Sequence, residues 1–339
     1  MAASVFNGVK YLSEVNYCVL TKKLLSLNLF CTNRCNSRCK TCNIWKKKPN
    51  EDLSVEVIEM ILKDKKITNY TTFSLTGGEF ILHPKYREIL TLFEEYNRKY
   101  ILLTNGILAD KLIKTVREFK IKNVSISMDG PRATYKDVRG VDNYDNICKI
   151  VNELKSSTDI HIHYTINPYN NPSGLKEVVN FCQENNLELS LDVYQNIDYF
   201  NVSEKNVSVK SYICLIDTAF KDISNHNFIK MYDLWFNNKI FLPCWSIKVI
   251  TTILPNGDVL LCQFKNLILG NVYKTELSNI WNSKNSDKLK SNYLNCNSCW
   301  LGCQRGFDCN MVWVLNKVIP SVLLKKIVGP YDFNKALRC

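Results

Sequence analysis

The feature that most constrains the fold is an alternation of strand-like and helix-like segments over the first two thirds of the chain. The apolar and alternating runs predict six β-strands: Leu25–Phe30, Thr72–Thr76, Tyr100–Thr104, Asn123–Met128, Ile160–Ile166 and Leu187–Tyr194. Helical patterns follow them at Ser54–Lys66, Tyr86–Arg98, Ala109–Lys120, Tyr144–Lys155, Gly174–Asn185 and Val209–Lys221. This order favours a parallel sheet with right-handed crossovers. We therefore predict an α/β fold, a partial (β/α)6 TIM-like barrel.

The chemically distinctive runs all follow predicted strands. They are the cysteine loop after the first strand, Gly77-Gly78-Glu79, Thr104-Asn105-Gly106, Asp129-Gly130 and Asn167. In a parallel barrel the carboxyl ends of the strands form the active-site face. The sequence therefore predicts one site at this edge.

The last predicted strands each have one polar face, because successive side chains point to opposite sides. Those polar faces carry His161, His163, Glu188, Asp192 and Tyr194. A closed barrel without an internal cavity is filled with branched apolar side chains. A polar interior therefore predicts a cavity that holds a ligand. Asp192, nearest the active-site end of its strand, is the predicted catalytic-site residue and substrate contact. His161 and Glu188 either share this role or satisfy each other, and the two histidines lack a clear third metal ligand.

Cys35, Cys39 and Cys42 form a C-x3-C-x2-C pattern in one loop. They supply one thiolate fewer than the four that normally hold a cubane iron–sulfur cluster. One iron is then left open, and an open position lets a metal site act on a bound molecule. Zinc, with a fourth ligand such as Cys31, is the alternative.

Composition places few further limits on the function. With 46% apolar and 22% charged residues in 339, the chain suits one large α/β domain and a small appended one. The net charge of +12 is spread over many segments, with one dense run at Lys46–Lys48. This predicts a solvated basic surface and no specific nucleic-acid site. Without a secretory pattern, the fifteen cysteines are expected to be reduced thiols and metal ligands, and the location cytoplasmic.

The cysteine loop, Gly77-Gly78-Glu79, Ser127-x-Asp129-Gly130 and Arg139-Gly140 together resemble the radical S-adenosylmethionine (SAM) enzymes over about residues 25–194. The resemblance implies a SAM-binding [4Fe-4S] cluster on the three cysteines. It implies that Gly77, Gly78 and Glu79 hold the methionyl amino group, and that Ser127 and Arg139 hold the ribose and carboxylate. Asp129 and Asn167 complete the expected cofactor-binding set. Phe80 replaces the usual proline, and Asn43-Ile44-Trp45 leaves the adenine contact open.

The resemblance implies an activity with three participants. An external one-electron reductant of the flavodoxin or ferredoxin type reduces the cluster, SAM is cleaved to methionine and a 5′-deoxyadenosyl radical, and that radical takes a hydrogen atom from a polar substrate. The alternative is an iron–sulfur electron carrier or metal-binding scaffold. A carrier has no need of the glycine–glutamate run, Ser127 and Arg139.

A second cysteine group follows. Cys244, the Asn256-Gly257 turn and Cys262 predict a hairpin, and Cys296, Cys299, Cys303 and Cys309 come after it. The pattern resembles the auxiliary-cluster extensions called SPASM or twitch domains, with the last two spacings reversed. It implies one auxiliary iron–sulfur cluster on Cys244, Cys262, Cys296 and Cys299. Cys303 and Cys309 are possible substitutes for these ligands or ligands of a second cluster, and structural zinc is the alternative.

We expect an N-terminal extension (1–23), the core domain (24–225), the cluster domain (226–310) and an apolar tail (311–339). Residues 311–328 are expected to dock on the barrel or to contact a partner or a membrane surface. With about 24 residues before the first strand, no peptide-recognition domain is evident there. Gln263 stands where sulfatase-maturing relatives have an aspartate, which argues against that reaction. The substrate is left open between a peptide and a sugar-like or alcohol-like small molecule.

Overall fold

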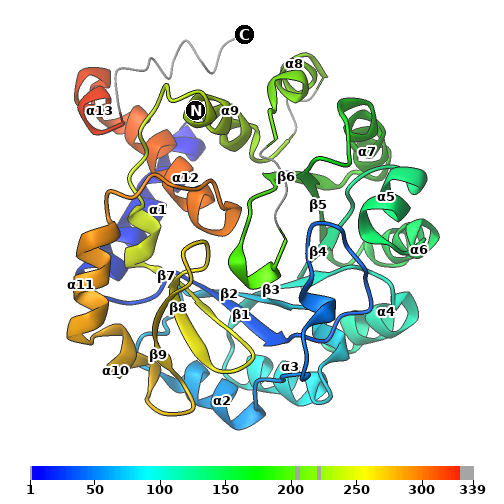
Figure 1. Ribbon diagram of the computed structural model, residues 1–339, viewed down its shortest axis with the longest axis horizontal. Helices are drawn as coiled ribbons and strands as arrows, with labels where there is room; N and C mark the ends of the chain where they lie inside the picture. The colour runs from blue at the N-terminus through cyan, green and yellow to red at the C-terminus, as the bar shows by residue number, and fades with distance from the viewer. Residues whose placement is uncertain (1, 203–206, 220–222, 329–339) are drawn as a thin grey trace.

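A computed structural model describes residues 2–202, 207–219 and 223–328. Six parallel strands follow one another along a curved sheet: β1 (Ser26–Thr32), β2 (Thr72–Gly77), β3 (Lys99–Thr104), β4 (Asn123–Ser127), β5 (Asp159–Ile166) and β6 (Glu188–Val193). Helices α2 (Val55–Lys63), α3 (Tyr86–Glu95), α4 (Ala109–Glu118), α5 (Arg132–Arg139), α6 (Tyr144–Leu154) and α7 (Pro172–Asn185) surround its outer side (Figure 1). The predicted partial barrel is confirmed.

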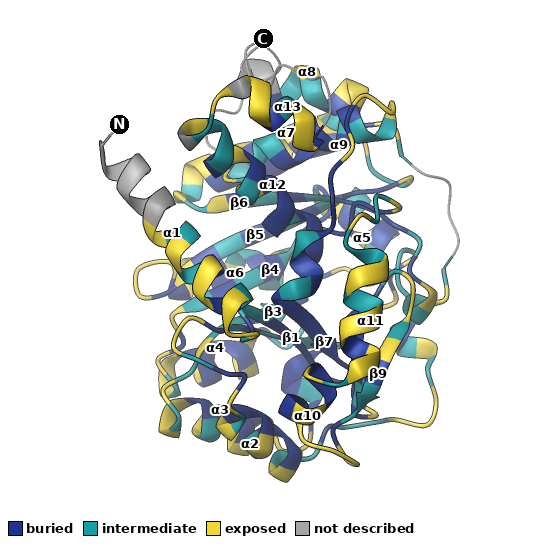
Figure 2. Cartoon of the chain, turned by 90° about the vertical axis from the view of Figure 1, so that its left-hand side faces the viewer, coloured by how far each residue is buried: buried dark blue, intermediate teal, exposed yellow. Residues whose placement is uncertain are grey.

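The sequence explains these elements locally. Along β5, Ile160, Ile162, Tyr164 and Ile166 are buried under the helices, while the intervening polar residues face the interior. Ser54 caps α2, because its side chain accepts a hydrogen bond from the Val57 amide. Figure 2 shows the resulting arrangement, with buried strands inside and exposed outer faces on helices such as α2 and α3.

The sheet continues beyond the six strands. β7 (Ile250–Ile253) pairs in parallel with β1, and β8 (Asp258–Cys262) and β9 (Leu267–Asn271) extend it in antiparallel fashion. The predicted hairpin is present, and Gly257 has φ +86° in its turn, a conformation that suits glycine. No local sequence pattern indicates that this hairpin joins the barrel sheet. The pairing anchors the second cysteine group directly beside the first strand.

The remaining helices close the molecule: α1 (Ala2–Leu20), α8 (Lys210–Ala219), α9 (His226–Phe236), α10 (Leu277–Trp281), α11 (Lys284–Tyr293), α12 (Gly302–Val318) and α13 (Ser321–Val328). Helix α12 contacts α1 and α9 and lies between β6 and β7 in Figure 1. It runs continuously across the boundary placed between residues 310 and 311. Val312 and Val314 are buried, so this part of the tail docks on the body of the protein. None of the described helices is both long and apolar enough to cross a membrane.

Candidate active site

Three cysteine thiols lie in the loop after β1, close enough to influence one another electrostatically. Cys39 is buried, and burial raises the pKa of Cys35 to about 11 and of Cys42 to about 12, with mutual repulsion among the thiolates adding to the rise. Three deprotonated sulfurs in this place need a strongly positive partner, and the iron ions of a cluster provide one. The site therefore fits the predicted cluster. Cys31 packs in the apolar core with Leu29, which argues against it as a fourth ligand.

The two glycines before Glu79 allow two backbone segments to approach each other. A Cβ on Gly77, which has φ +126°, would lie 2.2 Å from the Thr32 carbonyl oxygen, and one on Gly78 would lie 2.1 Å from that of Arg34. The Gly78 amide donates to the Thr32 carbonyl at 2.8 Å, and the Glu79 amide to the Arg34 carbonyl at 2.8 Å. The glycines thus fasten this run to the cysteine loop. The sequence suggested that these glycines make room for a ligand. In the structure, the space that a Cβ would take is occupied by the backbone of the cysteine loop.

Glu79 connects the ends of β2 and β3. Its buried carboxylate accepts from Thr104 Oγ1 at 2.9 Å and from the Asn105 amide at 2.8 Å. Burial raises its pKa to about 7, and these hydrogen bonds oppose the rise. Asn105 Nδ2 donates in turn to Asn36 Oδ1 of the cysteine loop at 2.8 Å. Each carboxylate oxygen has a second lone pair, so Glu79 keeps acceptor capacity for a ligand.

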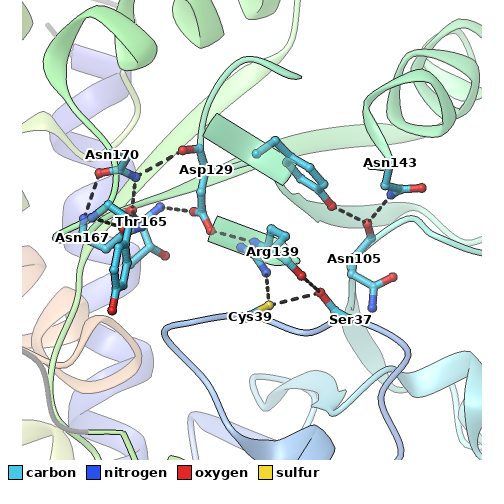
Figure 3. A network of polar contacts seen from close by, with 11 residues as sticks. Ser37, Cys39, Asn105, Asp129, Arg139, Asn143, Thr165, Asn167 and Asn170 are labelled. Carbon is cyan, nitrogen blue, oxygen red and sulfur yellow. Dashed lines mark hydrogen bonds and ion pairs between the residues drawn. The ribbon is translucent and has the colours of Figure 1, made fainter. Parts of the chain in front are cut away.

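Asp129 and Arg139 form a buried ion pair beside Cys39 (Figure 3). Arg139 Nε lies 2.6 Å from Asp129 Oδ2, and Arg139 Nη1 lies 3.8 Å from the Cys39 sulfur. Burial lowers the pKa of Arg139, but Asp129 and Cys39 outweigh it and the net shift is upward. The Arg139 carbonyl also accepts from Ser37 Oγ at 3.0 Å. Arg139 is therefore not a surface residue, and it joins the cysteine loop to the end of β4.

Ser127 and Asn167 lie at the same edge of the sheet. Ser127 is half-buried on β4, in register with His163 of β5. Asn167 accepts from the Tyr169 amide at 2.9 Å and donates to the Thr165 carbonyl at 2.9 Å, which closes the turn after β5 (Figure 3). Its side chain is thus occupied within the turn. The structure brings all seven predicted cofactor-binding residues to this edge, and their roles as ligands stay predictions.

A cavity of about 760 Å³ opens inside the barrel. Strand residues such as His163 and Asp192 line one side, and one face of α12 lines another, through Cys303, Gly306, Asn310 and Trp313. These four recur at helical spacing. Among the described lining residues there is no lysine or arginine, and Asp192 is the single carboxylate.

Asp192 reaches this cavity without a cationic partner among the described residues. Its Oδ1 accepts from the Val193 amide at 2.7 Å, and burial raises its pKa to about 7. Gly302 leaves room for it, since a Cβ there would lie 2.3 Å from Asp192 Oδ2. The predicted substrate contact is thus placed on the cavity wall.

Glu188 lies outside the cavity. Its side chain is 65% exposed, and His161 Nδ1 lies 3.0 Å from its Oε2. The two do satisfy each other, but near the amino end of their strands, so the expectation that Glu188 faces the lumen is wrong. His163 does line the cavity, 3.0 Å from Ser190 Oγ, and burial lowers its pKa.

The second cysteine group surrounds a separate small pocket, lined by Cys244, Cys262, Cys296 and Cys299. Cys303 and Cys309 of α12 do not line this pocket and instead line the large cavity. Over residues 2–202, 207–219 and 223–328, no three His, Cys, Asp or Glu side chains form a group that could hold a metal ion. A cubane spreads its thiolates more widely, because each binds a different iron. Four cysteines around one pocket fit such a cluster.

Arg305 organises this pocket, although it belongs to none of the motifs predicted from the sequence. Its guanidinium donates to the carbonyls of Cys299 at 3.0 Å, Pro243 at 3.1 Å and Cys296 at 3.3 Å. Asp308, one turn along α12, accepts from Arg305 Nη1 at 2.9 Å. The i, i+3 spacing of an arginine and an aspartate was the available signal. Nothing in the sequence places their partners.

The chain resembles known proteins over both domains. Residues 29–182 match the model of the radical SAM superfamily, and residues 244–303 match that of SPASM, an iron–sulfur cluster-binding domain. A probable GTP 3′,8-cyclase of Archaeoglobus fulgidus is 27% identical over 40% of this chain and 45% of its own length. AlbA of Bacillus subtilis, named for biosynthesis of the antilisterial bacteriocin subtilosin, is 26% identical over 76% of this chain and 59% of its own length. The chain thus spans about half the length of these curated relatives.

The fold is also that of Streptococcus suis SuiB. SuiB bound to S-adenosylmethionine superposes with a TM-score of 0.60, and SuiB bound to its precursor peptide SuiA with 0.63. Identity is 18% in both cases, over 80% of this chain and 68% or 67% of SuiB. The cofactors of these families are [4Fe-4S] clusters and SAM, as expected from the cysteines. The chain therefore belongs to the radical SAM superfamily and carries a SPASM iron–sulfur domain.

Proposed function

We propose that this chain is a radical SAM enzyme that removes a hydrogen atom from a polar substrate without phosphate groups, most consistent with a peptide. Bound at the three-cysteine loop, the cluster and SAM supply one-electron cleavage chemistry. Cys35, Cys39 and Cys42 would hold that cluster. Glu79, Ser127 and Arg139, with Gly77, Gly78, Asp129 and Asn167, would position SAM. Cys244, Cys262, Cys296 and Cys299 would hold the auxiliary cluster.

The charge of the cavity lining is the main support for this substrate class. Its described lining offers one carboxylate, Asp192, and no lysine or arginine. A nucleoside triphosphate carries several negative charges, which proteins bind with cationic side chains or metal ions. Such a substrate is therefore disfavoured here, although the cyclases are named for GTP. Amide, hydroxyl or amine groups suit the asparagines, serines and carboxylate of the wall.

The relatives support a peptide in a second way. The match to AlbA extends over 76% of the chain, whereas the match to the A. fulgidus cyclase covers 40%. SuiB, of the same fold, holds a precursor peptide in its crystal structure. A sugar-like alcohol would meet the same polar wall and is the second candidate.

Anaerobic reconstitution with iron and sulfide, followed by dithionite and SAM, tests the enzyme class. We expect 5′-deoxyadenosine and methionine in equal amounts. Reduced, cluster-loaded protein that neither binds nor cleaves SAM would instead support the electron-carrier alternative.

Changing Asp192 to alanine should impair turnover of substrate by 10-fold or more, about 1.4 kcal/mol or greater. Uncoupled SAM cleavage should stay within about twofold of wild type, because Asp192 lies on the cavity wall and not among the SAM residues. The measurement is the ratio of product to 5′-deoxyadenosine.

Glu188→Ala is the matched control, a carboxylate on the same strand but 65% exposed at its side chain. It should leave both activities unchanged. Equal loss of the two activities in Asp192→Ala would move Asp192 into the cofactor site or the fold, and normal turnover would remove it from the site.

A further inference from the structure

Helix α12 contains a glycine that the backbone conformation does not require. Gly306 is the fifth residue of the helix, and its φ is not in the positive region. Its conformation is therefore one that any residue adopts. A glycine inside a helix makes the helix less stable than an alanine would, because glycine loses more backbone freedom on folding. Some other property of the site has to account for a glycine here.

Close packing does not account for it either. A Cβ added to Gly306 would have no heavy atom of the described residues within 4 Å, its chain neighbours and the nearby backbone of the helix aside. By contrast, a Cβ on Gly302 would lie 2.3 Å from Asp192 Oδ2, so a neighbouring side chain explains that glycine. The open space beside Gly306 belongs to the large cavity, which Gly306 lines between Cys303 and Asn310.

This open space lies next to the predicted substrate contact. Figure 1 shows α12 beside β6, the strand that carries Asp192. Gly302 and Gly306 are about one turn apart on the same face of α12, roughly 6 Å along the helix axis. The Asp192 carboxylate lies against Gly302, so a substrate group held by Asp192 would bring its neighbouring atoms beside Gly306. None of the seven residues assigned to SAM is part of the described cavity lining.

We infer that Gly306 is a specificity-determining residue, which keeps room beside Asp192 so that the substrate lies directly against the backbone of α12. This inference rests on the proposed function. Room for a ligand offsets the stability that a glycine costs the helix. The contact is one of shape, because the backbone amide of a residue inside a helix is already hydrogen-bonded within the helix. A side chain added at this position should therefore exclude the substrate according to its size.

The test follows the source of the hydrogen atom that the 5′-deoxyadenosyl radical takes. Two probes represent the two substrate classes: tryptic peptides from protein grown in heavy water, and perdeuterated glucose. The radical breaks a C–D bond of the probe and forms a C–D bond at its own 5′ carbon, which leaves a carbon radical on the probe. With cluster-loaded protein, dithionite and SAM, mass spectrometry gives the deuterated fraction of 5′-deoxyadenosine separately from its total amount.

Two variants fill the space to different extents. One methylene in a binding pocket changes discrimination by about 10- to 200-fold. We therefore expect the deuterated fraction to fall about 10-fold in Gly306→Ala and about 100-fold in Gly306→Leu. Gly306→Ala should also raise the midpoint of thermal unfolding by about 2 °C, because alanine is the better helix former. A structural role of Gly306 would not produce a variant that is more stable and less active.

Asn152→Ala is the matched control for the gain in stability. Asn152 is exposed on the outer helix α6, where alanine is again the better helix former. This variant should raise the unfolding midpoint and keep the wild-type deuterated fraction. Iron content is measured in every variant, because Arg305, next to Gly306, borders the auxiliary pocket.

Three results would overturn the inference. A wild-type deuterated fraction in Gly306→Leu would show that the substrate does not use this space. A lower unfolding midpoint in Gly306→Ala, or loss of iron in either variant, would assign the glycine to the fold. SAM cleavage by the wild type with no deuterium from either probe would mean that neither substrate class reaches Gly306. Absence of SAM cleavage in the wild type would instead refute the proposed function itself and is thereby distinguishable.

Discussion

Replacing Cys35, Cys39 and Cys42 together with alanine should abolish SAM cleavage and leave about half of the iron and sulfide bound. The loss should exceed 1,000-fold, about 4 kcal/mol or more, because the four cysteines of the C-terminal pocket would leave no open iron to bind SAM. The C-terminal pocket has its own four cysteines and contacts none of the three. Iron and sulfide analysis with electron paramagnetic resonance of the reduced protein would measure both effects.

Cys31→Ala supplies the control for this experiment. Cys31 lies in β1, directly before the cysteine loop, and is buried in the apolar core, so its removal should preserve both iron content and cleavage. Iron falling to zero in the triple variant would show that no auxiliary cluster forms. Zinc in its place would make the C-terminal domain structural.

The barrel was predictable because its signals are local. Alternation along residues 160–166 and 187–194 gave both the strands and the buried faces, and the distinctive runs marked the active edge. Helix α5 was missed, because it is short and mostly polar, and only Tyr135 and Val138 of its eight residues are buried. The pairing of β7 with β1 was missed for another reason, since contacts between distant segments leave no local pattern.

In the active site, too, the sequence predicted individual residues but not the contacts between distant segments. Sequence motifs named Arg139 and Asp129, but their mutual ion pair and the approach of Arg139 to Cys39 depend on how α5 returns to the cysteine loop. The placement of Cys303 follows from helix geometry. It shares a face of α12 with Asn310, whereas Arg305 and Asp308 lie on another face, toward the auxiliary pocket.

Arg305→Met should destabilise the C-terminal domain by about 3–5 kcal/mol and remove the auxiliary cluster. The guanidinium is almost fully buried and is the common donor to the carbonyls of Cys296 and Cys299. Without it, Asp308 is a buried carboxylate that has lost its cation. Chemical unfolding of the cluster-free protein measures the first effect, and iron content after reconstitution measures the second.

The pH dependence of stability and a double variant separate two effects of Arg305: its charge beside Asp308, and its hydrogen bonds to the cysteine carbonyls. Burial already raises the pKa of Asp308 to about 6 in the wild type, against the opposing pull of Arg305. Because the folded state then binds the proton more tightly than the unfolded state, stability falls as pH rises through this range, and losing Arg305 extends the fall to higher pH. The Arg305→Met defect should therefore be larger at pH 8 than at pH 5.

Arg305→Met/Asp308→Leu removes both charges, and replacing a buried pair by apolar groups is often close to neutral for stability. We expect the double variant to recover most of the unfolding free energy but not the auxiliary iron, because the cysteine carbonyls still lack their shared donor. Recovery of both would mean that Arg305 acts only by neutralising Asp308. Retention of full iron in the single variant would show that the four cysteines are positioned without it.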